Sequence, residues 1–233
     1  MTGRGDVAPR IAVVVPVHGN EATLRPLAAR LAAALAGRPW RLRFVIDASP
    51  DDSAAVARAL AARDVRIAVT GLTTNVGQHA ALARGLMAEP DADAWVCLDA
   101  DLQDPPEAVP LLLDRLCRGD VAAVFAGRRG RYQSRMRRLT GTLHRRVVAR
   151  LTGLPPDAGA FFAMDAEVRD AVVTAVLDEG APSVVLAVTR AGRPVTSVPV
   201  DRERRTEGRS AWTGRARLRQ SARSLVYAVR SRR

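Results

Sequence analysis

Short apolar runs alternate with helix-type patterns along the first hundred residues, and this alternation limits the fold more than any other feature. The runs are rich in Val, Ile and Leu and lie at residues 11–16, 43–47, 65–69 and 94–98. Strands that alternate with helices at this spacing predict a mostly parallel sheet with right-handed crossovers. The expected fold class is therefore α/β, with a mostly parallel central sheet flanked by helices.

The polar segments that follow these strands are the first candidates for a site. Parallel strands end at the same edge of a sheet, and ligands of open α/β sheets bind beyond that edge. The loops after the first, second and fourth strands therefore predict a cleft of nucleotide size. Thr23 is expected to cap the helix after the first strand, and Gln78 to cap the helix before the fourth.

The remaining elements follow from the same patterns. Helices are expected over residues 24–36, 54–62, 80–87, 107–118, 135–151 and 167–177, a strand over 121–126, a loop over 155–162, and apolar runs over 182–189 and 195–200. The helix over 135–151 is very basic.

An acidic stretch, Trp95 to Pro106, follows directly on the fourth apolar run. Asp99 and Asp101 stand one residue apart at the expected end of a buried strand, and Leu-Gln-Asp-Pro-Pro follows them. Paired carboxylates of this kind suit a hard divalent cation, Mg²⁺ or Mn²⁺, that shares its ligand shell with water and substrate phosphates. The competing interpretation is a solvated turn that caps the next helix.

Composition narrows the class of protein. The 233 residues suffice for one large domain or two small ones, and 48% hydrophobic residues exclude a chain disordered throughout. The formal net charge is +12, and all 36 basic residues are Arg, whose guanidinium group suits phosphates and carboxylates. Cys97 and Cys117 form neither a disulfide framework nor a metal site, which favours a reducing cytoplasm.

The two ends of the chain differ from its middle. Residues 1–10 are expected to be flexible and contain no apolar signal segment, and no apolar run reaches the length of a membrane span. Residues 202–233 predict a basic flexible loop and then a helix with one apolar face. That helix either lies at an anionic membrane surface or packs back on the domain. The expected location is cytoplasmic, either free or peripheral at the inner face of the membrane.

Five segments together resemble the family-2 glycosyltransferases of the GT-A fold, and more narrowly the dolichyl-phosphate mannose synthase and polyprenyl-phosphate sugar transferase branch. They are residues 13–17, 47–51, 75–82, 99–106 and 205–212. The resemblance covers about residues 11–212. It implies a GT-A nucleotide-diphospho-sugar transferase domain at 11–201, with a nucleotide-binding half at 11–104 and an acceptor half at 105–201.

The resemblance also implies roles for individual residues. The base and ribose of a nucleoside-diphosphate sugar would contact Pro16, His18, Asn20, Asp47, Asp99 and Ala100. Asp99 and Asp101 would bind Mg²⁺ or Mn²⁺, and the residues nearest the chemistry would be Asp101, Gln103, Asp157 and Arg128. Phosphates of donor or acceptor would contact Arg131, Arg202, Arg205 and Ser210. For Asp47 and Asp51, capping of the next helix remains an alternative.

Three departures from the family pattern bear on activity. Ile46-Asp47 replaces a usual Asp-Asp pair, and His18-Gly19-Asn20 replaces Tyr-Asn-Glu. Ala160 stands where many relatives have an acidic residue that serves as a base. The alternatives are a phosphate nucleophile, which needs no base, Asp157 as the base, or loss of activity.

The leading hypothesis is a metal-dependent inverting glycosyltransferase of hexosyltransferase type. Its acceptor would be either a polyprenyl phosphate or a hydroxyl or amine of a small metabolite. The second hypothesis is a catalytically degenerate nucleotide-sugar-binding or scaffold protein on the same fold. Nucleic-acid binding ranks last because few aromatic residues accompany the charge. The sequence leaves a homodimer open, and it contains neither a Gly-x-Gly-x-x-Gly motif after the first strand nor any Lys.

Overall fold

The computed structural model describes residues 9–129, 149–203 and 227. Their centre is a seven-stranded sheet in the order β3-β2-β1-β4-β6-β5-β7. The strands are β1 (Ile11–Val17), β2 (Trp40–Asp47), β3 (Ile67–Leu72), β4 (Ala94–Cys97), β5 (Ala123–Arg129), β6 (Phe162–Met164) and β7 (Val195–Asp201). The predicted α/β class with a mostly parallel sheet is confirmed.

The parallel part of the sheet is built around β1, which pairs with β2 on one side and β4 on the other. Its Ile-Ala-Val-Val-Val run is buried on both faces, as expected for a strand covered by helices on each side. Only β6 runs against its neighbours β4 and β5, and β5 is parallel to β7. The carboxyl ends of β1, β2, β3, β4, β5 and β7 therefore share one edge.

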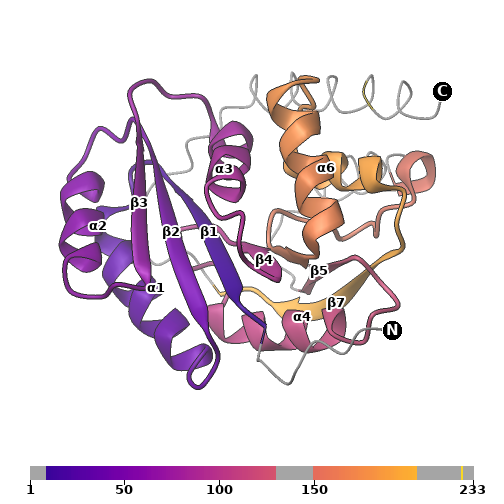
Figure 1. The fold of residues 1–233 in the computed structure, drawn as a ribbon, viewed down its shortest axis with the longest axis horizontal. Helices are drawn as coiled ribbons and strands as arrows, with labels where there is room; N and C mark the ends of the chain where they lie inside the picture. Colours follow the sequence, from indigo (N-terminus) through magenta and orange to yellow (C-terminus); the bar gives the residue numbers. More distant parts are fainter. Residues whose placement is uncertain (1–8, 130–148, 204–226, 228–233) are drawn as a thin grey trace, which may run out of the picture.

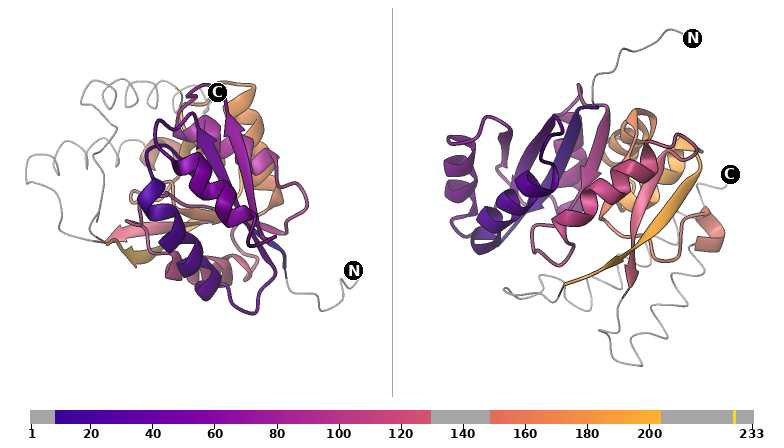
Figure 2. Two further views of the ribbon diagram at one scale, coloured as in Figure 1. Left: turned by 90° about the vertical axis from the view of Figure 1, so that its left-hand side faces the viewer. Right: turned by 90° about the horizontal axis from the view of Figure 1, so that it is seen from below.

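Helices cover both faces of the sheet (Figure 1). One face carries α1 (Glu21–Ala34), α2 (Ser53–Ala61), the 3-10 turn η1 (Pro106–Ala108) and α4 (Val109–Leu116). The other carries α3 (Gln78–Met87), α6 (Ala166–Leu177), α7 (Val184–Ala187) and the 3-10 turn η2 (Val188–Ala191). Seen from below, α1 and α4 lie in front of the strands (Figure 2, right).

Alternate residues of β1 supply the two halves of the core. Val13 and Val15 belong to the cluster that contains Leu24 and Leu27 of α1, whereas Val14 packs in the cluster of α3 and α6. A Cβ at Gly85 of α3 would collide with the side chains of Val14 and Val45, so α3 can approach the sheet closely only with glycine there. This close approach holds α3 against β1 and β2.

Several element boundaries differ from those predicted. Helix α1 begins at Glu21 rather than near residue 24, and Asn20 is its N-cap residue. Strand β3 is shifted from 65–69 to Ile67–Leu72, and Val65 is 94% exposed. The apolar run at 182–189 forms α7 and the start of η2. The earlier start of α1 follows from hydrogen bonds to the loop after β2, which local sequence does not report.

Parts of the prediction lie outside the described residues. Of the basic helix expected over 135–151, the structure describes only its end, where residues 149–152 are helical. The flexible ends and the C-terminal helix likewise fall almost entirely outside, and the division at residue 104 stays a prediction. Within the ranges that the structure describes, no helix combines the length and apolarity needed to cross a membrane.

Candidate functional site

The loops that follow β1 and β2 interlock at the carboxyl edge of the sheet. The ring Nδ1 of His18 lies 2.9 Å from the carbonyl oxygen of Asp47. The backbone N–H of Gly19 donates to Ser49 Oγ at 2.8 Å, and that of Asn20 donates to Ser53 Oγ at 3.1 Å. These bonds bring the predicted residues His18, Asn20 and Asp47 together, and Pro16 lies just before them on β1.

Asp47 connects this pair of loops to the beginning of α3. Its side chain is 3% exposed, and its two oxygens accept the backbone N–H groups of Val76 and Gly77 at 2.7 and 2.8 Å. Gly77 has φ 86°, which favours glycine. The carboxylate therefore fixes the segment before α3 rather than capping α2. Whether it also contacts a base stays a prediction.

Asp51 fixes the start of α1 from the neighbouring loop. It accepts the backbone N–H of Glu21 at 3.1 Å and the hydroxyl of Ser49 at 2.6 Å, and Glu21 in return accepts the N–H of Asp52. Burial alone would raise the pKa of Asp51, but hydrogen bonds from Ser49, Ser53 and the backbone outweigh it and lower the pKa to about 2. The predicted cap of α1, Thr23, is thus wrong, because the next loop supplies the hydrogen-bond acceptors.

The segment after β4 is joined to both neighbouring helices. Gln78 Nε2 of α3 donates to Asp99 Oδ1 at 2.7 Å, so this side chain orients a carboxylate rather than capping its helix. Thr23 of α1 donates to the carbonyl oxygen of Ala100 at 2.6 Å. Asp99 is half-buried. Burial of the Cys97 thiol raises the pKa of that thiol, and the negative charge of Asp99 raises it further. Cys97 is therefore inert at neutral pH.

Asp101 sits in a tight turn beyond Ala100. Its Oδ1 accepts the backbone N–H of Gln103 at 3.1 Å, a turn closed by a side chain. Leu102 between them has φ 57°, a left-handed conformation that a branched side chain rarely adopts. Such strain persists where surrounding contacts enforce it. Asp99 and Asp101 are both half-buried and come from the same sheet edge as His18 and Asn20.

Asp104 belongs to the same acidic stretch, and no role was predicted for it. It is 2% exposed, and Arg202 forms two hydrogen bonds with its carboxylate, at 2.5 and 3.0 Å. Arg202 was predicted to contact a phosphate, but in this structure its guanidinium group contacts Asp104. The pairing joins residues 98 positions apart, a distance over which the sequence pattern carries no signal.

Asp157 lies beside β5 and β7. Its Oδ2 is 3.3 Å from Ser197 Oγ and fills the space that a Cβ at Gly127 would occupy. Its Oδ1 is buried and has no hydrogen-bond partner among the described residues. In the sheet register Ser197 aligns with Phe125, Phe162 and Cys97, and Gly127 lies near the carboxyl end of β5, so Asp157 lies towards the same sheet edge as Asp99.

The other predicted residues are located only in part. Arg128 lies at the carboxyl end of β5, opposite Val200 of β7. Arg131, Arg205 and Ser210 lie outside the described residues. Ala160 is 8% exposed, so the residue in place of the usual acid is buried.

The donor set at this edge fits a hard cation that binds together with its substrate. Within the described ranges, no cluster of three or more His, Cys, Asp or Glu side chains could hold a metal ion alone. Asp99 and Asp101 offer two carboxylates, and Mg²⁺ and Mn²⁺ sites of this type complete their shell with water and phosphate oxygens. The residues therefore fit a cation bound with a diphosphate.

Curated proteins with similar sequences include sugar transferases that are named for a lipid phosphate. An undecaprenyl-phosphate 4-deoxy-4-formamido-L-arabinose transferase of Pseudomonas paraeruginosa is 38% identical over 148 residues, 62% of this chain and 43% of the relative. The transferase of the same name from Shewanella sediminis is 32% identical over 207 residues, 87% of this chain and 61% of the relative. The chain thus spans about half the length of these curated relatives.

Solved structures with similar folds are glycosyltransferases of the GT-A type. A mannosyltransferase from Pyrobaculum calidifontis in complex with GDP-Man and Mn²⁺ superposes with TM-score 0.67 at 19% identity, covering 97% of this chain and 67% of the other. Glucosyl-3-phosphoglycerate synthase from Mycobacterium tuberculosis, with Mn²⁺, UDP and phosphoglyceric acid, gives TM-score 0.69 at 19% identity, covering 94% and 78%. The sheet described above is thus a GT-A fold.

The family model described as glycosyl transferase family 2 matches residues 12–169. This match covers β1 to β6 and includes Asp47, Asp99 and Asp101. Together with the GT-A fold, it shows that this chain belongs to glycosyl transferase family 2.

Proposed function

We propose that this chain transfers a sugar from a nucleoside-diphosphate sugar to an acceptor, by direct displacement at the anomeric carbon with inversion. The observation that carries the proposal is the position of Asp99 and Asp101. These two half-buried carboxylates follow β4 at the edge where the loops after β1 and β2 interlock. A donor placed there would have its base against one pair of loops and its diphosphate against the carboxylates.

The donor is held by residues of several loops in this proposal. His18 and Asn20, with Pro16 and Asp47, hold the base, because amide and imidazole groups suit its polar edge. Asp99 and the backbone of Ala100 lie at the ribose, Asp101 at the diphosphate and Gln103 beside the sugar. Arg128, Arg131, Arg205 and Ser210 are proposed to contact phosphates of donor or acceptor.

Asp99 and Asp101 would hold Mg²⁺ or Mn²⁺ against the diphosphate. When bound, the cation supplies positive charge that stabilises the leaving nucleoside diphosphate. The Mn²⁺ in the two solved structures of similar fold supports a divalent cation in this role. In this chain Gln78 orients Asp99 and the N–H of Gln103 orients Asp101, so both carboxylates are held in place before a donor arrives.

The acceptor is either a polyprenyl phosphate or a hydroxyl or amine of a small metabolite. The undecaprenyl-phosphate relatives support a lipid phosphate, which is already anionic and needs no base. The placement of Asp157 at the same edge supports a hydroxyl acceptor, for which it would accept the proton. A lipid acceptor would agree with peripheral membrane contact through the basic C-terminal segment.

Formation of a homodimer is a separate proposal.

A thermal-shift and turnover screen tests this function. UDP, GDP, dTDP, CDP and their sugars are each added to the purified chain with Mn²⁺, with Mg²⁺ or with EDTA. We expect one nucleotide to raise the melting temperature only when metal is present, because a ligand that binds the native state stabilises it. The matching sugar should then be hydrolysed or transferred.

The same screen separates the second candidate, a degenerate nucleotide-sugar-binding protein. Buried Ala160 in place of the family's acidic residue favours this candidate. Metal-dependent binding without transfer or hydrolysis, with both a polyprenyl phosphate and hydroxyl acceptors present, would support it. A folded chain that no nucleotide stabilises would contradict both candidates.

A further inference from the structure

The last residues described at the end of β7 are attached to the acidic loop after β4. Arg202 forms a two-bond ion pair with Asp104, and the two side chains are 22% and 3% exposed. A charge as buried as that of Asp104 is stable only when it is paired. The ion pair therefore fixes where this loop lies relative to the end of β7.

A backbone contact extends this attachment towards Asp101. The N–H of Glu203 donates to the carbonyl oxygen of Gln103 at 2.9 Å, while the N–H of Gln103 donates to Asp101 Oδ1 at 3.1 Å. The backbone of Gln103 is thus held from both sides. Its orientation determines where its N–H points, and hence how the Asp101 carboxylate is turned.

A third contact supports the same loop from outside. Arg30 of α1 donates to Glu107 at 2.6 Å and to Glu203 at 2.5 Å, so one guanidinium group joins the acidic loop, the segment after β7 and helix α1. Glu107 and Glu203 together raise the pKa of Arg30 further above its already high value. These contacts hold the segment just after Leu102, whose left-handed backbone persists where surrounding contacts enforce it.

We propose that Arg202 is a positioning residue for the metal-binding carboxylate Asp101, acting through Asp104 and the backbone of Gln103. This inference rests on the proposed function, because it presupposes that Asp101 binds a cation with a nucleoside diphosphate. It replaces the sequence-based role of Arg202 as a phosphate ligand. The positioning residue lies 101 positions from the carboxylate that it orients.

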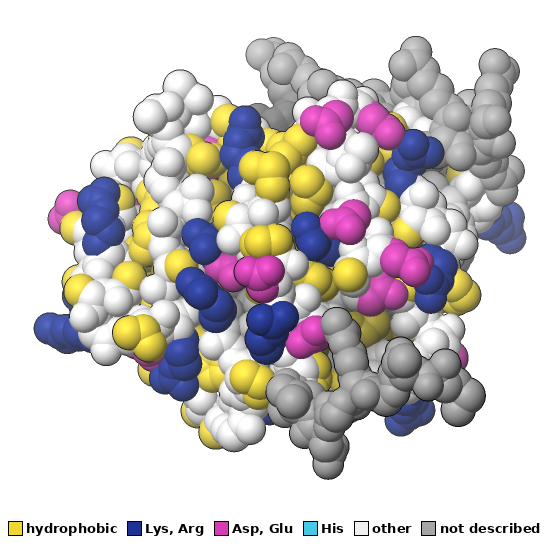
Figure 3. All heavy atoms as spheres, viewed as in Figure 1, with side chains coloured by type: hydrophobic (Ala, Val, Ile, Leu, Met, Phe, Trp, Pro, Cys, Tyr) yellow, Lys and Arg dark blue, Asp and Glu magenta, His cyan; other side chains and the backbone are white. Residues whose placement is uncertain are grey.

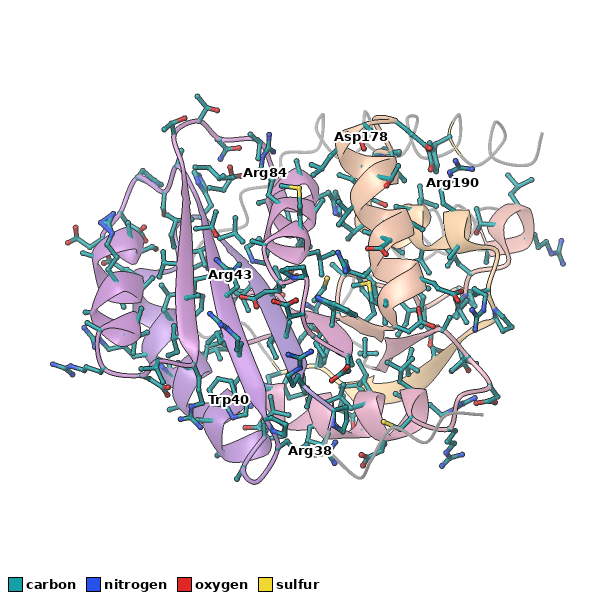
Figure 4. The ribbon with its side chains drawn as sticks, viewed as in Figure 1. Arg38, Trp40, Arg43, Arg84, Asp178 and Arg190 are labelled. Atoms are coloured by element: carbon teal, nitrogen blue, oxygen red, sulfur yellow. The ribbon has the colours of Figure 1, made fainter. Side chains whose placement is uncertain are left out.

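Two substitutions test the proposal against a matched control. Arg202→Lys keeps the charge but loses the paired donors, and Asp104→Asn keeps the shape but loses the charge. The control is Arg43→Lys. Arg43, on β2 (Figure 4), pairs with Glu89 at 2.7 Å, with side chains 14% and 9% exposed. Glu89 follows the C-terminal end of α3, and its carbonyl oxygen accepts the ring N–H of Trp95 near the start of β4, so this pair lies away from the acidic loop.

The measurement is a Mn²⁺ titration of the full chain at saturating UDP or GDP, read as the change in melting temperature, beside the melting temperature without ligand. We expect Arg202→Lys and Asp104→Asn each to raise the half-saturating Mn²⁺ concentration about ten-fold, as for substitution of other groups that orient metal ligands. Arg43→Lys should lower the ligand-free melting temperature about as much as Arg202→Lys does, because each breaks one buried ion pair. It should leave the half-saturating Mn²⁺ concentration unchanged.

The outcomes distinguish the alternatives. If Asp104→Asn left the Mn²⁺ requirement unchanged or tightened nucleotide binding, Arg202 would be a phosphate ligand released from its partner, and the proposal would be wrong. Equal shifts in the Mn²⁺ requirement for all three variants would show a general loss of stability, which also overturns it. If the unsubstituted chain showed no metal-dependent nucleotide binding, the proposed function would fail first, and this inference with it.

Discussion

Two pairs of aspartates lie at the same edge of the sheet, and the structure treats them differently. After β2, Asp47 is 3% exposed with both oxygens on backbone N–H groups. Asp51 accepts hydrogen bonds from two serine hydroxyl groups and from two backbone N–H groups. After β4, Asp99 and Asp101 are half-buried, and their hydrogen bonds come from Gln78 and from the N–H of Gln103.

The difference shows that aspartates at one sheet edge have two roles: one pair holds loops, and the other pair can bind a cation. A carboxylate enclosed by N–H groups of another loop holds that loop, because its charge is satisfied inside the protein. A carboxylate that reaches solvent while being held from one side can still bind a cation. We therefore expect substitutions of the first pair to change stability and those of the second pair to change metal-dependent chemistry.

The described residues on the face that carries α3 and α6 do not show the strong positive charge of the whole chain. On the face shown in Figure 3, Arg side chains are interspersed with acidic ones. Among the ion pairs are Arg43 of β2 with Glu89 and Arg190 of η2 with Glu179. Interspersed charges give a weaker attraction for a polyanion than a continuous basic surface. The described residues of this face therefore form no continuous basic surface.

The largest effect is expected for Asp101→Ala. Loss of a metal-binding carboxylate should lower metal-dependent sugar transfer about 10³-fold or more, with little change in melting temperature, because the side chain is half-buried. Initial rates of donor consumption with Mn²⁺ measure this. Retained turnover in the presence of metal would contradict the assignment of Asp101.

Asp47→Ala should give the opposite result. Its removal leaves the N–H groups of Val76 and Gly77 without their acceptors, which we expect to lower the free energy of unfolding by about 2–4 kcal/mol. Urea unfolding at neutral pH measures the loss, and Asp47→Asn, which keeps one acceptor, serves as the graded control. A stable variant with weakened nucleotide binding would instead place the Asp47 carboxylate at the base, as the sequence suggests.

The sequence predicted β1, β2, β4 and β5 well because each is a local apolar run, whereas β6 (Phe162–Met164) was not predicted and its first residue was assigned to a loop. The Ile-Ala-Val-Val-Val run of β1 is apolar at every position, which indicates a strand covered on both faces. The buried stripe of α4 is formed, as expected, by Val109, Leu112, Leu113 and Leu116. The convergence of the polar loops followed from the parallel order of the strands. Periodicity and topology were sufficient for these features.

The contacts that hold the site could not be read in the same way. The start of α1 is set by Ser49, Asp51 and Ser53 from the next loop, and Arg202 meets Asp104 across 98 positions. Both depend on the assembled fold, because the partners have no spacing that periodicity detects. A single sequence therefore located the aspartates but did not distinguish those that hold loops from those that face a ligand.

A smaller effect is expected for Gln78→Ala, which tests whether Asp99 depends on the neighbouring side chain that orients it. Gln78 donates to Asp99 at 2.7 Å, and removal of a group that orients a metal ligand typically costs about ten-fold or more in metal affinity or activity. Gln78→Glu also removes the donor, but its carboxylate adds negative charge beside Asp99 that attracts a cation, so we expect it to lose less Mn²⁺ affinity than Gln78→Ala. The apparent Mn²⁺ affinity in the presence of nucleotide measures both. Equal activity of all three chains would show that Asp99 needs no such support.

The smallest effect is expected for Asp51→Asn, and it depends on pH. The folded chain lowers the pKa of Asp51 from 3.8 to about 2, so protonation favours the unfolded chain. The stabilisation is therefore complete above about pH 4 and is lost as the pH falls towards 2. Because the carboxylate is partly solvated, we expect about 1 kcal/mol at neutral pH. Urea unfolding of both chains at pH 6 and pH 3 should show the difference between them shrinking in acid. A difference that stayed constant would mean that the shape of the loop, rather than the charge of Asp51, holds the start of α1.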